Sequence, residues 1–159
     1  MSVLVELGLP DVVQEFLREQ SVLTLATADV EGPWAAPVYY VADADGLVFV
    51  SSPRSRHAGA FFGPVAGAIP GPAVGWSALR GVQVAGEVVV LDGDARAAAA
   101  ALYRARYPAE ADDNALAAVF ARAAWYRFCV RRLVWTDNAQ GLGARRVYLP
   151  NNAVWAPPR

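Results

Sequence analysis

The sequence predicts a mainly β protein: a small closed β-barrel with peripheral helices packed outside it. About seven segments have the composition and alternation of strands, whereas few have a helical pattern. The first three strand segments follow one another with short turns, which indicates an antiparallel meander rather than a βαβ unit. Gly81 and Gly86 interrupt the longest strand segment at positions where bulges or bends would help a sheet curve and close.

The first third of the chain is expected to form one helix and the three strands of the meander. Pro10 and Asp11 suit a helix start. The apolar residues behind them share one helical stripe: Val12, Val13, Phe16 and Leu17. Residues rich in strand formers then occupy three runs: 21–27, 34–42 and 47–52. Turn signals separate these runs at 29–33 and at Asp43-Ala44-Asp45-Gly46.

The rest of the chain is expected to alternate further strands with short helices. Strands are predicted over four segments: 65–69, 79–91, 125–135 and 145–149. Helical turns are predicted over three: 55–62, 95–106 and 115–123. Asp92-Gly93-Asp94 and Asn114 are the predicted helix caps, and Pro108 ends the helix before it. Residues 137–143 are expected as a loop and 150–159 as a loose tail.

The bulk composition favours one domain, residues 1–159, with a core from about 10 to 149. The chain is 55% hydrophobic, and so apolar a small domain is expected to hide part of its surface in an oligomer. Its net charge of −1 argues against nucleic-acid binding. A single cysteine, Cys129, and a single histidine leave no internal disulfide and no zinc site, so no metal is expected.

The sequence predicts a cytoplasmic protein that does not span a membrane. The N-terminal segment lacks the positive region of a signal peptide and meets Glu6 and Asp11 early. No apolar run reaches the length of a membrane span.

The stretch that suggests chemistry is the loop after the third strand, Ser51-Ser52-Pro53-Arg54-Ser55-Arg56-His57. It carries three hydroxyls, two guanidiniums and the only histidine of the chain. Hydroxyl and backbone donors beside fixed positive charge are what a bound anion requires. The loop is therefore a candidate phosphate site. The alternative is an ordinary polar turn, because serine, proline and arginine are common loop residues.

Three segments of the chain resemble a known family when they are taken in order. The first is Ser52-Pro53-Arg54-Ser55-Arg56-His57, and the second is Arg80-Gly81-Val82-Gln83-Val84-Ala85-Gly86-Glu87. The third is Val134-Trp135-Thr136-Asp137-Asn138 with Gly141-Leu142-Gly143, accompanied by Tyr103-Arg104-Ala105-Arg106-Tyr107-Pro108. Together they resemble the flavin-binding split barrel of pyridoxamine 5′-phosphate oxidase and its relatives. The last segment is similar to a small bacterial branch of uncharacterised members.

The resemblance implies an antiparallel FMN-binding split barrel that forms a homodimer, with two FMN molecules in clefts between the subunits. It implies an oxidoreductase that acts on an unidentified small molecule. The phosphate contacts it implies are Ser52, Ser55, Arg56 and His57, of which Arg56 is the firmest, because guanidinium holds phosphate in a bidentate way. Ring and ribityl contacts would come from Pro37, Val38, Tyr39, Tyr40, Val50 and Ser51. Arg80 or Gln83 would lie near the cleft.

The chain departs from the family pattern at two places. His57 stands where lysine is usual, and an imidazole supplies a full charge only when it is protonated. The late arginine-and-histidine motif that holds vitamin B6 is also missing, because no histidine follows His57. The resemblance therefore does not extend to vitamin B6 oxidation.

Other readings of the same residues stay open. The fold could bind a deazaflavin (F420), or haem with His57 as the only histidine available for the axial position. It could also be a flavin carrier without catalysis, or an interaction barrel without cofactor. Arg80 and Gln83 could face solvent, and Asp137-Asn138 is read as a turn-former. Trp34, Trp76, Trp125 and Trp135 are assigned to core or dimer packing.

Overall fold

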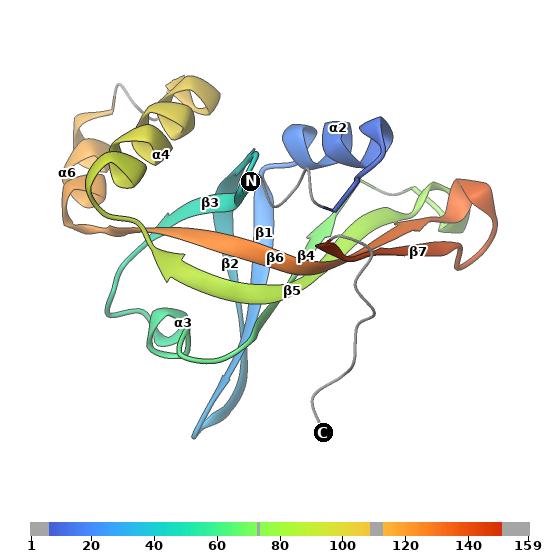
Figure 1. The fold of residues 1–159 in the computed structure, drawn as a ribbon, viewed down its shortest axis with the longest axis horizontal. Helices are drawn as coiled ribbons and strands as arrows, with labels where there is room; N and C mark the ends of the chain where they lie inside the picture. The colour runs from blue at the N-terminus through green and yellow to red at the C-terminus, as the bar shows by residue number, and fades with distance from the viewer. Residues whose placement is uncertain (1–6, 73, 109–112, 151–159) are drawn as a thin grey trace.

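The computed structural model describes residues 7–72, 74–108 and 113–150, and its architecture confirms the predicted barrel (Figure 1). Seven strands are described: β1 Val22–Asp29, β2 Gly32–Asp43, β3 Gly46–Ser51, β4 Val65–Pro70, β5 Arg80–Val90, β6 Ala124–Asp137 and β7 Arg145–Tyr148. The helices are α2 Asp11–Glu19, α3 Arg56–Gly59, α4 Gly93–Arg106 and α6 Asn114–Arg122, with short 3₁₀ turns η1 Trp76–Ala78 and η2 Asn138–Gln140.

The sheet closes because β3, at one end of the strand order, also pairs with β6, the last strand but one. The strand order is β3-β2-β1-β4-β5-β6-β7, and β3 also pairs with β6, from Leu47 opposite Phe128 to Ser51 opposite Ala124. Six antiparallel strands therefore form a closed barrel, while β7 extends the sheet beyond β6. Closure removes the exposed edges that β1 to β6 would otherwise present.

Of the two glycines predicted to mark a bulge or bend in the longest strand, Gly86 lies at a β-bulge. The register of β5 against β6 shifts between Ala85 and Gly86, where Gly86 lies opposite Val130 and Ala85 lies opposite Arg132. Arg131 is the extra residue of this β-bulge. The bulge resets the alternation of β6, so Leu133 and Trp135 face the same side as Phe128 and Val130.

The barrel interior forms one core, and the helices close it. Alternating strand residues such as Leu23, Leu25, Leu47, Phe49 and Phe128 are fully buried. The α2 residues Val13, Phe16 and Leu17 join this core, and Ala58 and Phe61 from the α3 region pack against it. In Figure 1, α2 lies above the barrel and α3 below it.

A second apolar cluster lies outside the barrel, under α4 and α6. Its buried residues are Val41, Val48, Leu91, Ala99, Tyr103, Tyr107 and Trp125. Tyr103 contacts both Phe120 of α6 and Trp125 of β6 edge to face, so aromatic packing holds the two helices on the strands.

Several local expectations need correction. Val12 is 48% exposed, because its position on α2 lies off the buried stripe. Asp113, not Asn114, caps α6, and its carboxylate accepts from the backbone N–H groups of Ala115 and Leu116. Asp92 stands at the start of α4 without a side-chain cap bond. Of the predicted tail, residues 151–159 lie outside the described residues.

Within the described part of the chain, no helix is long and apolar enough to cross a membrane.

Candidate functional site

The loop after β3 is built around the side chain of His57. The Ser51 Oγ lies 2.7 Å and the Ser55 Oγ 3.0 Å from His57 Nε2. The Ser55 hydroxyl also donates to the carbonyl of Ser52 at 2.8 Å and accepts from the N–H of Ala58. Ser55 is thus the cap of α3, and these bonds fix the loop in one shape.

His57 is a buried organiser of the loop and not a free cation. The residue is buried, and its ring lies against Phe61 with 5.9 Å between ring centroids. Burial lowers the pKa of His57 below its ordinary value of 6.5, so the imidazole is neutral at pH 7. The resemblance places His57 among the phosphate contacts, and the structure places its Nε2 against two serine hydroxyls.

Arg56, the residue expected to be the firmest phosphate contact, is bound to the β1–β2 hairpin. Its Nε and Nη2 donate to the two Asp29 carboxylate oxygens at 2.9 and 3.0 Å, and its guanidinium lies 4.6 Å from the ring centre of Trp34. Glu31 adds a second carboxylate at 3.7 Å. The charge of Arg56 is therefore already compensated. Sequence reasoning missed this partner, because Asp29 reads only as a turn residue.

The exposed side of the loop opens into a cavity of about 340 Å³ between the loop and α6. Ser52, Pro53 and Arg54 line it on one side, with Ala118, Val119, Arg122 and Ala123 on the other. Neither Arg54 nor Arg122 has an ion pair with a described residue. Two uncompensated guanidiniums beside a serine hydroxyl can hold an anion. Nothing in the sequence pattern pointed to Arg122, since α6 brings it there from a distant position.

The outer face of four barrel strands is largely exposed and is made mostly of small apolar residues. Pro37 of β2, Thr24 of β1, Ala68 of β4 and Gln83 of β5 form one row across the sheet by their register. The neighbouring row is Ala35, Ala26, Ala66 and Ala85. Pro37 and Gln83, both predicted site residues, thus share one open face. A continuous apolar surface of this kind is typical of an interface.

The other predicted ring contacts are divided between surface and core. Tyr39 is 60% exposed and meets Tyr107 edge to face. Val38 and Tyr40 lie in the barrel core, and the Tyr40 hydroxyl donates to the carbonyl of Leu17 at 2.7 Å. Burial raises the pKa of the Tyr40 hydroxyl, which stays protonated. Val50 packs against the cluster under α4 and α6. Val38, Tyr40 and Val50 therefore have structural partners within the chain.

Arg80 lies apart from the loop, at the far end of β5. Its Nε donates to Asp137 Oδ1 at 3.1 Å, and the same carboxylate oxygen accepts from the N–H of Ala139. Asn138 donates from Nδ2 to the Trp76 carbonyl and accepts from the Gly143 N–H. Asp137 and Asn138 are turn-formers, as predicted, and they fasten η2 to η1.

The described residues include no group of three or more metal-ligating side chains. Cys129 is half-buried, and burial raises the pKa of its thiol, so it has no thiolate character at pH 7.

The sequence matches known proteins along most of its length. A family model described as pyridoxamine 5′-phosphate oxidase matches residues 9–133. A UPF0306 protein of Photorhabdus laumondii is 29% identical over 138 residues, which are 84% of this chain and 91% of that protein. The UPF0306 protein YhbP of Escherichia coli is 28% identical over 147 residues, 89% of this chain and 94% of that one.

Solved structures share the fold. A heme binding protein from Mycobacterium smegmatis superposes with a TM-score of 0.68 at 24% identity, over 89% of this chain and 59% of that longer one. HutZ, the heme storage protein from Vibrio cholerae, gives 0.62 at 15% identity, over 87% and 92%. A FAD-binding protein from Mesorhizobium loti gives 0.61 at 17% identity, over 79% and 92%.

The barrel closure, the order of the three sequence segments and the family match over residues 9–133 lead to one conclusion. The chain belongs to the pyridoxamine 5′-phosphate oxidase family of split barrels.

Proposed function

We propose that this protein binds FMN between the subunits of a homodimer and acts as an FMN-dependent oxidoreductase on a small molecule. The observation that carries the proposal is the loop after β3. It is held rigid by His57 and Ser55, yet it presents Ser52 and Arg54 to an open cavity with a second uncompensated guanidinium, Arg122. A rigid set of hydroxyl and guanidinium donors suits a phosphate ester.

In this proposal Ser52 and Arg54 hold the phosphate, with Arg122 as the additional cation. Ser55 supplies the fixed geometry of the loop, and Arg56 fastens the loop to the β1–β2 hairpin through Asp29. His57 holds the Ser51 and Ser55 hydroxyls in place as a neutral ring. The family loop uses lysine at the position of His57, so Arg54 and Arg122 take over the charge that lysine would provide.

The exposed face of β2, β1, β4 and β5 is the surface proposed for the flavin ring and the second subunit. Its small side chains let another surface approach closely, and Pro37, Tyr39 and Gln83 lie on it. Covering this face also removes exposed apolar area from water, which stabilises a dimer.

Bound FMN would supply hydride-transfer chemistry. The chain's own residues would orient the cofactor and keep water from the ring. Gln83 and Thr24 are the polar residues of the two rows on the exposed face, and the amide of Gln83 can donate to a ring oxygen.

Haem is the second candidate, because two of the structural neighbours are named as a heme binding and a heme storage protein. The geometry disfavours His57 as an axial ligand, because the residue is buried and its Nε2 already contacts two hydroxyls. A haem complex would therefore use another ligand or rearrange the loop. A protein that binds F420 and a flavin carrier without catalysis would both use the same loop. Experiment distinguishes these two alternatives from the proposal.

The identity of the cofactor is tested by purifying the protein, denaturing it and identifying any released chromophore by mass. Released FMN with flavin absorbance supports the proposal. A Soret band that persists in His57→Ala would favour haem held by another residue and would remove His57 as the ligand. Light scattering tests the dimer, and a monomer that binds FMN would refute the cleft between subunits.

The loop is tested with Arg54→Gln. We expect FMN affinity to fall by about tenfold or more, because a charge-assisted phosphate contact is lost. Arg131→Gln is the matched control, since Arg131 lies at the β6 bulge and does not line the cavity. Equal effects of the two substitutions would show only a general loss of charge.

A further inference from the structure

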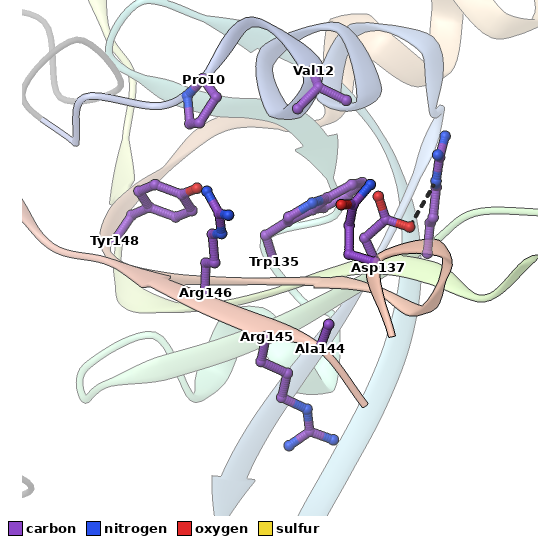
Figure 2. Close-up of a pocket in the computed structure, with 10 residues that line it drawn as sticks. Pro10, Val12, Trp135, Asp137, Ala144, Arg145, Arg146 and Tyr148 are labelled. Atoms are coloured by element: carbon purple, nitrogen blue, oxygen red, sulfur yellow. Dashed lines mark hydrogen bonds and ion pairs between the residues drawn. The ribbon is translucent and has the colours of Figure 1, made fainter. Parts of the chain in front are cut away.

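A second cavity, of about 460 Å³, lies between α2 and the β6–β7 hairpin (Figure 2). The residues that line it include Pro10 and Val12 at the start of α2, Arg80 at the start of β5, and Trp135, Arg146 and Tyr148 of the hairpin. The volume suits a small organic ligand.

The strand register decides which side chains face this cavity. Arg146 pairs with Trp135, and Tyr148 pairs with Leu133. Arg146 and Tyr148 therefore share a face with Trp135, which is only 6% exposed. Figure 2 shows the Arg146 guanidinium beside Tyr148 and below Pro10, while the Arg145 side chain points to the opposite side of β7.

The charges at the cavity do not cancel. Arg80 and Asp137 form an ion pair at 3.1 Å, so together they contribute no net charge. Arg146 has no ion pair or hydrogen bond with any residue in the described ranges. Arg145 also borders the cavity without an ion pair to a described residue, but its side chain points to the opposite side of β7. Arg146 is therefore the uncompensated guanidinium on the face that carries the buried Trp135 ring.

The apolar walls limit the kind of anion that fits. Pro10 and Val12 overhang the cavity from α2, and Trp135 and Tyr148 offer ring surface from below. Val12 is exposed here, because it lies off the buried stripe of α2 that Val13, Phe16 and Leu17 form. Apolar walls with one oriented cation are typical of sites for organic anions.

We propose that this cavity is a binding site for an organic monoanion: a carboxylate on a flat apolar body. The carboxylate pairs with Arg146, and the flat body lies between Val12 and the rings of Trp135 and Tyr148. The Arg80–Asp137 pair closes the end of the site. Of the residues assigned to the cofactor, only Arg80 also lines this site. Gln83 pairs with Val134 of β6, whereas the site lies on the opposite face of β6, which carries Trp135. It therefore does not depend on flavin binding.

The test is calorimetric titration of the whole protein with naphthoate, with and without FMN present. The neutral isostere naphthamide is the ligand control. We expect naphthoate to bind both samples, and naphthamide to bind about tenfold more weakly or not at all. Absence of naphthoate binding, or equal binding of the neutral amide, would overturn the proposal.

Two neighbouring arginines provide a matched pair of variants. Arg146→Gln is expected to weaken naphthoate by about tenfold or more. Arg145→Gln removes the same charge from the rim of the cavity, where the side chain points to the opposite side of β7, and it is expected to have a clearly smaller effect than Arg146→Gln. Arg146→Lys should recover part of the affinity and shows that any loss is not caused by misfolding. Equal loss in the two glutamine variants would refute Arg146 as the anchor.

Discussion

Arg56 and Asp29 form an ion pair with two hydrogen bonds, Nε to Oδ2 at 2.9 Å and Nη2 to Oδ1 at 3.0 Å. The two residues lie 27 positions apart, and their contact joins α3 to the β1–β2 hairpin. The loop that the sequence predicts as an anion site is therefore held to the barrel by an ion pair, in which the Asp29 carboxylate is the anion.

This ion pair predicts a pH dependence of stability. The hydrogen bond from Arg56 holds the pKa of Asp29 below its ordinary 3.8 in the folded state. The folded protein then resists protonation of Asp29, so the stabilisation is present above pH 3.8 and is lost as pH falls through the lower folded value. Asp29→Asn should unfold at lower urea than the natural protein near pH 7, and the difference should vanish in acid.

Asp45→Asn, in the exposed turn of the other hairpin, is the control for that series. It should leave the urea midpoint close to that of the natural protein at every pH, because no ion pair of the Asp45 carboxylate with the described residues is lost. A difference for Asp29→Asn that stays constant down to strong acid would contradict the ion-pair account.

Burial of His57 predicts a second, higher pH window. Its pKa lies below 6.5 in the fold, so the unfolded chain binds the proton more readily. The free energy of unfolding should therefore fall as pH drops below about 6.5. His57→Gln keeps a polar group near Ser51 but cannot titrate. In a urea series from about pH 7 to 5, the variant should lose less stability than the natural protein; parallel curves would show that His57 does not carry the effect.

The β-bulge predicts a strict requirement for glycine at position 86. A Cβ at Gly86 would collide with the carbonyl oxygen of Cys129 and approach the Phe128 ring at 3.1 Å. Gly86→Ala should lower the free energy of unfolding by about 1–3 kcal/mol, because backbone atoms must move. Gly59→Ala meets nothing within 4 Å and is the control. Equal stability of the two variants in urea unfolding would contradict this view of the bulge.

Asn138 is expected to stabilise the end of the sheet through its side chain. It is buried, donates to the Trp76 carbonyl at 2.8 Å and accepts from the Gly143 N–H at 3.0 Å. Asn138→Ala leaves both groups without these partners and should cost about 1–3 kcal/mol of unfolding free energy. The exposed neighbour Gln140→Ala should cost much less, and a reversed order would contradict the assigned roles.

The strands were predictable because their alternation is local. Leu23 and Leu25 of β1, or Phe128 and Val130 of β6, show on the sequence which face each strand buries. The pairing of Leu47 with Phe128, which closes the barrel, joins residues far apart in the chain and leaves no local signal. The cap of α6 was assigned one residue late, because Asp113 and Asn114 are equally good caps by type.

The candidate site was predictable as a loop but not as a set of contacts. The serine and arginine residues after β3 indicate that this loop is the candidate anion site. Pro37 and Gln83, which were also predicted, share one exposed face. The partners that decide the role of each side chain come from elsewhere: Asp29 neutralises Arg56, and α6 brings Arg122 to the loop. Long-range packing of this kind cannot be derived from residue types alone.

The loop after β3 is proposed to bind the phosphate of FMN, and a comparison of FMN with riboflavin isolates that contact. Riboflavin has the same ring and ribityl chain but no phosphate. Calorimetric titration of the purified, cofactor-free protein should give one FMN per subunit and affinity for FMN at least about tenfold above that for riboflavin. Equal affinity for the two ligands, or no binding of either, would contradict the account.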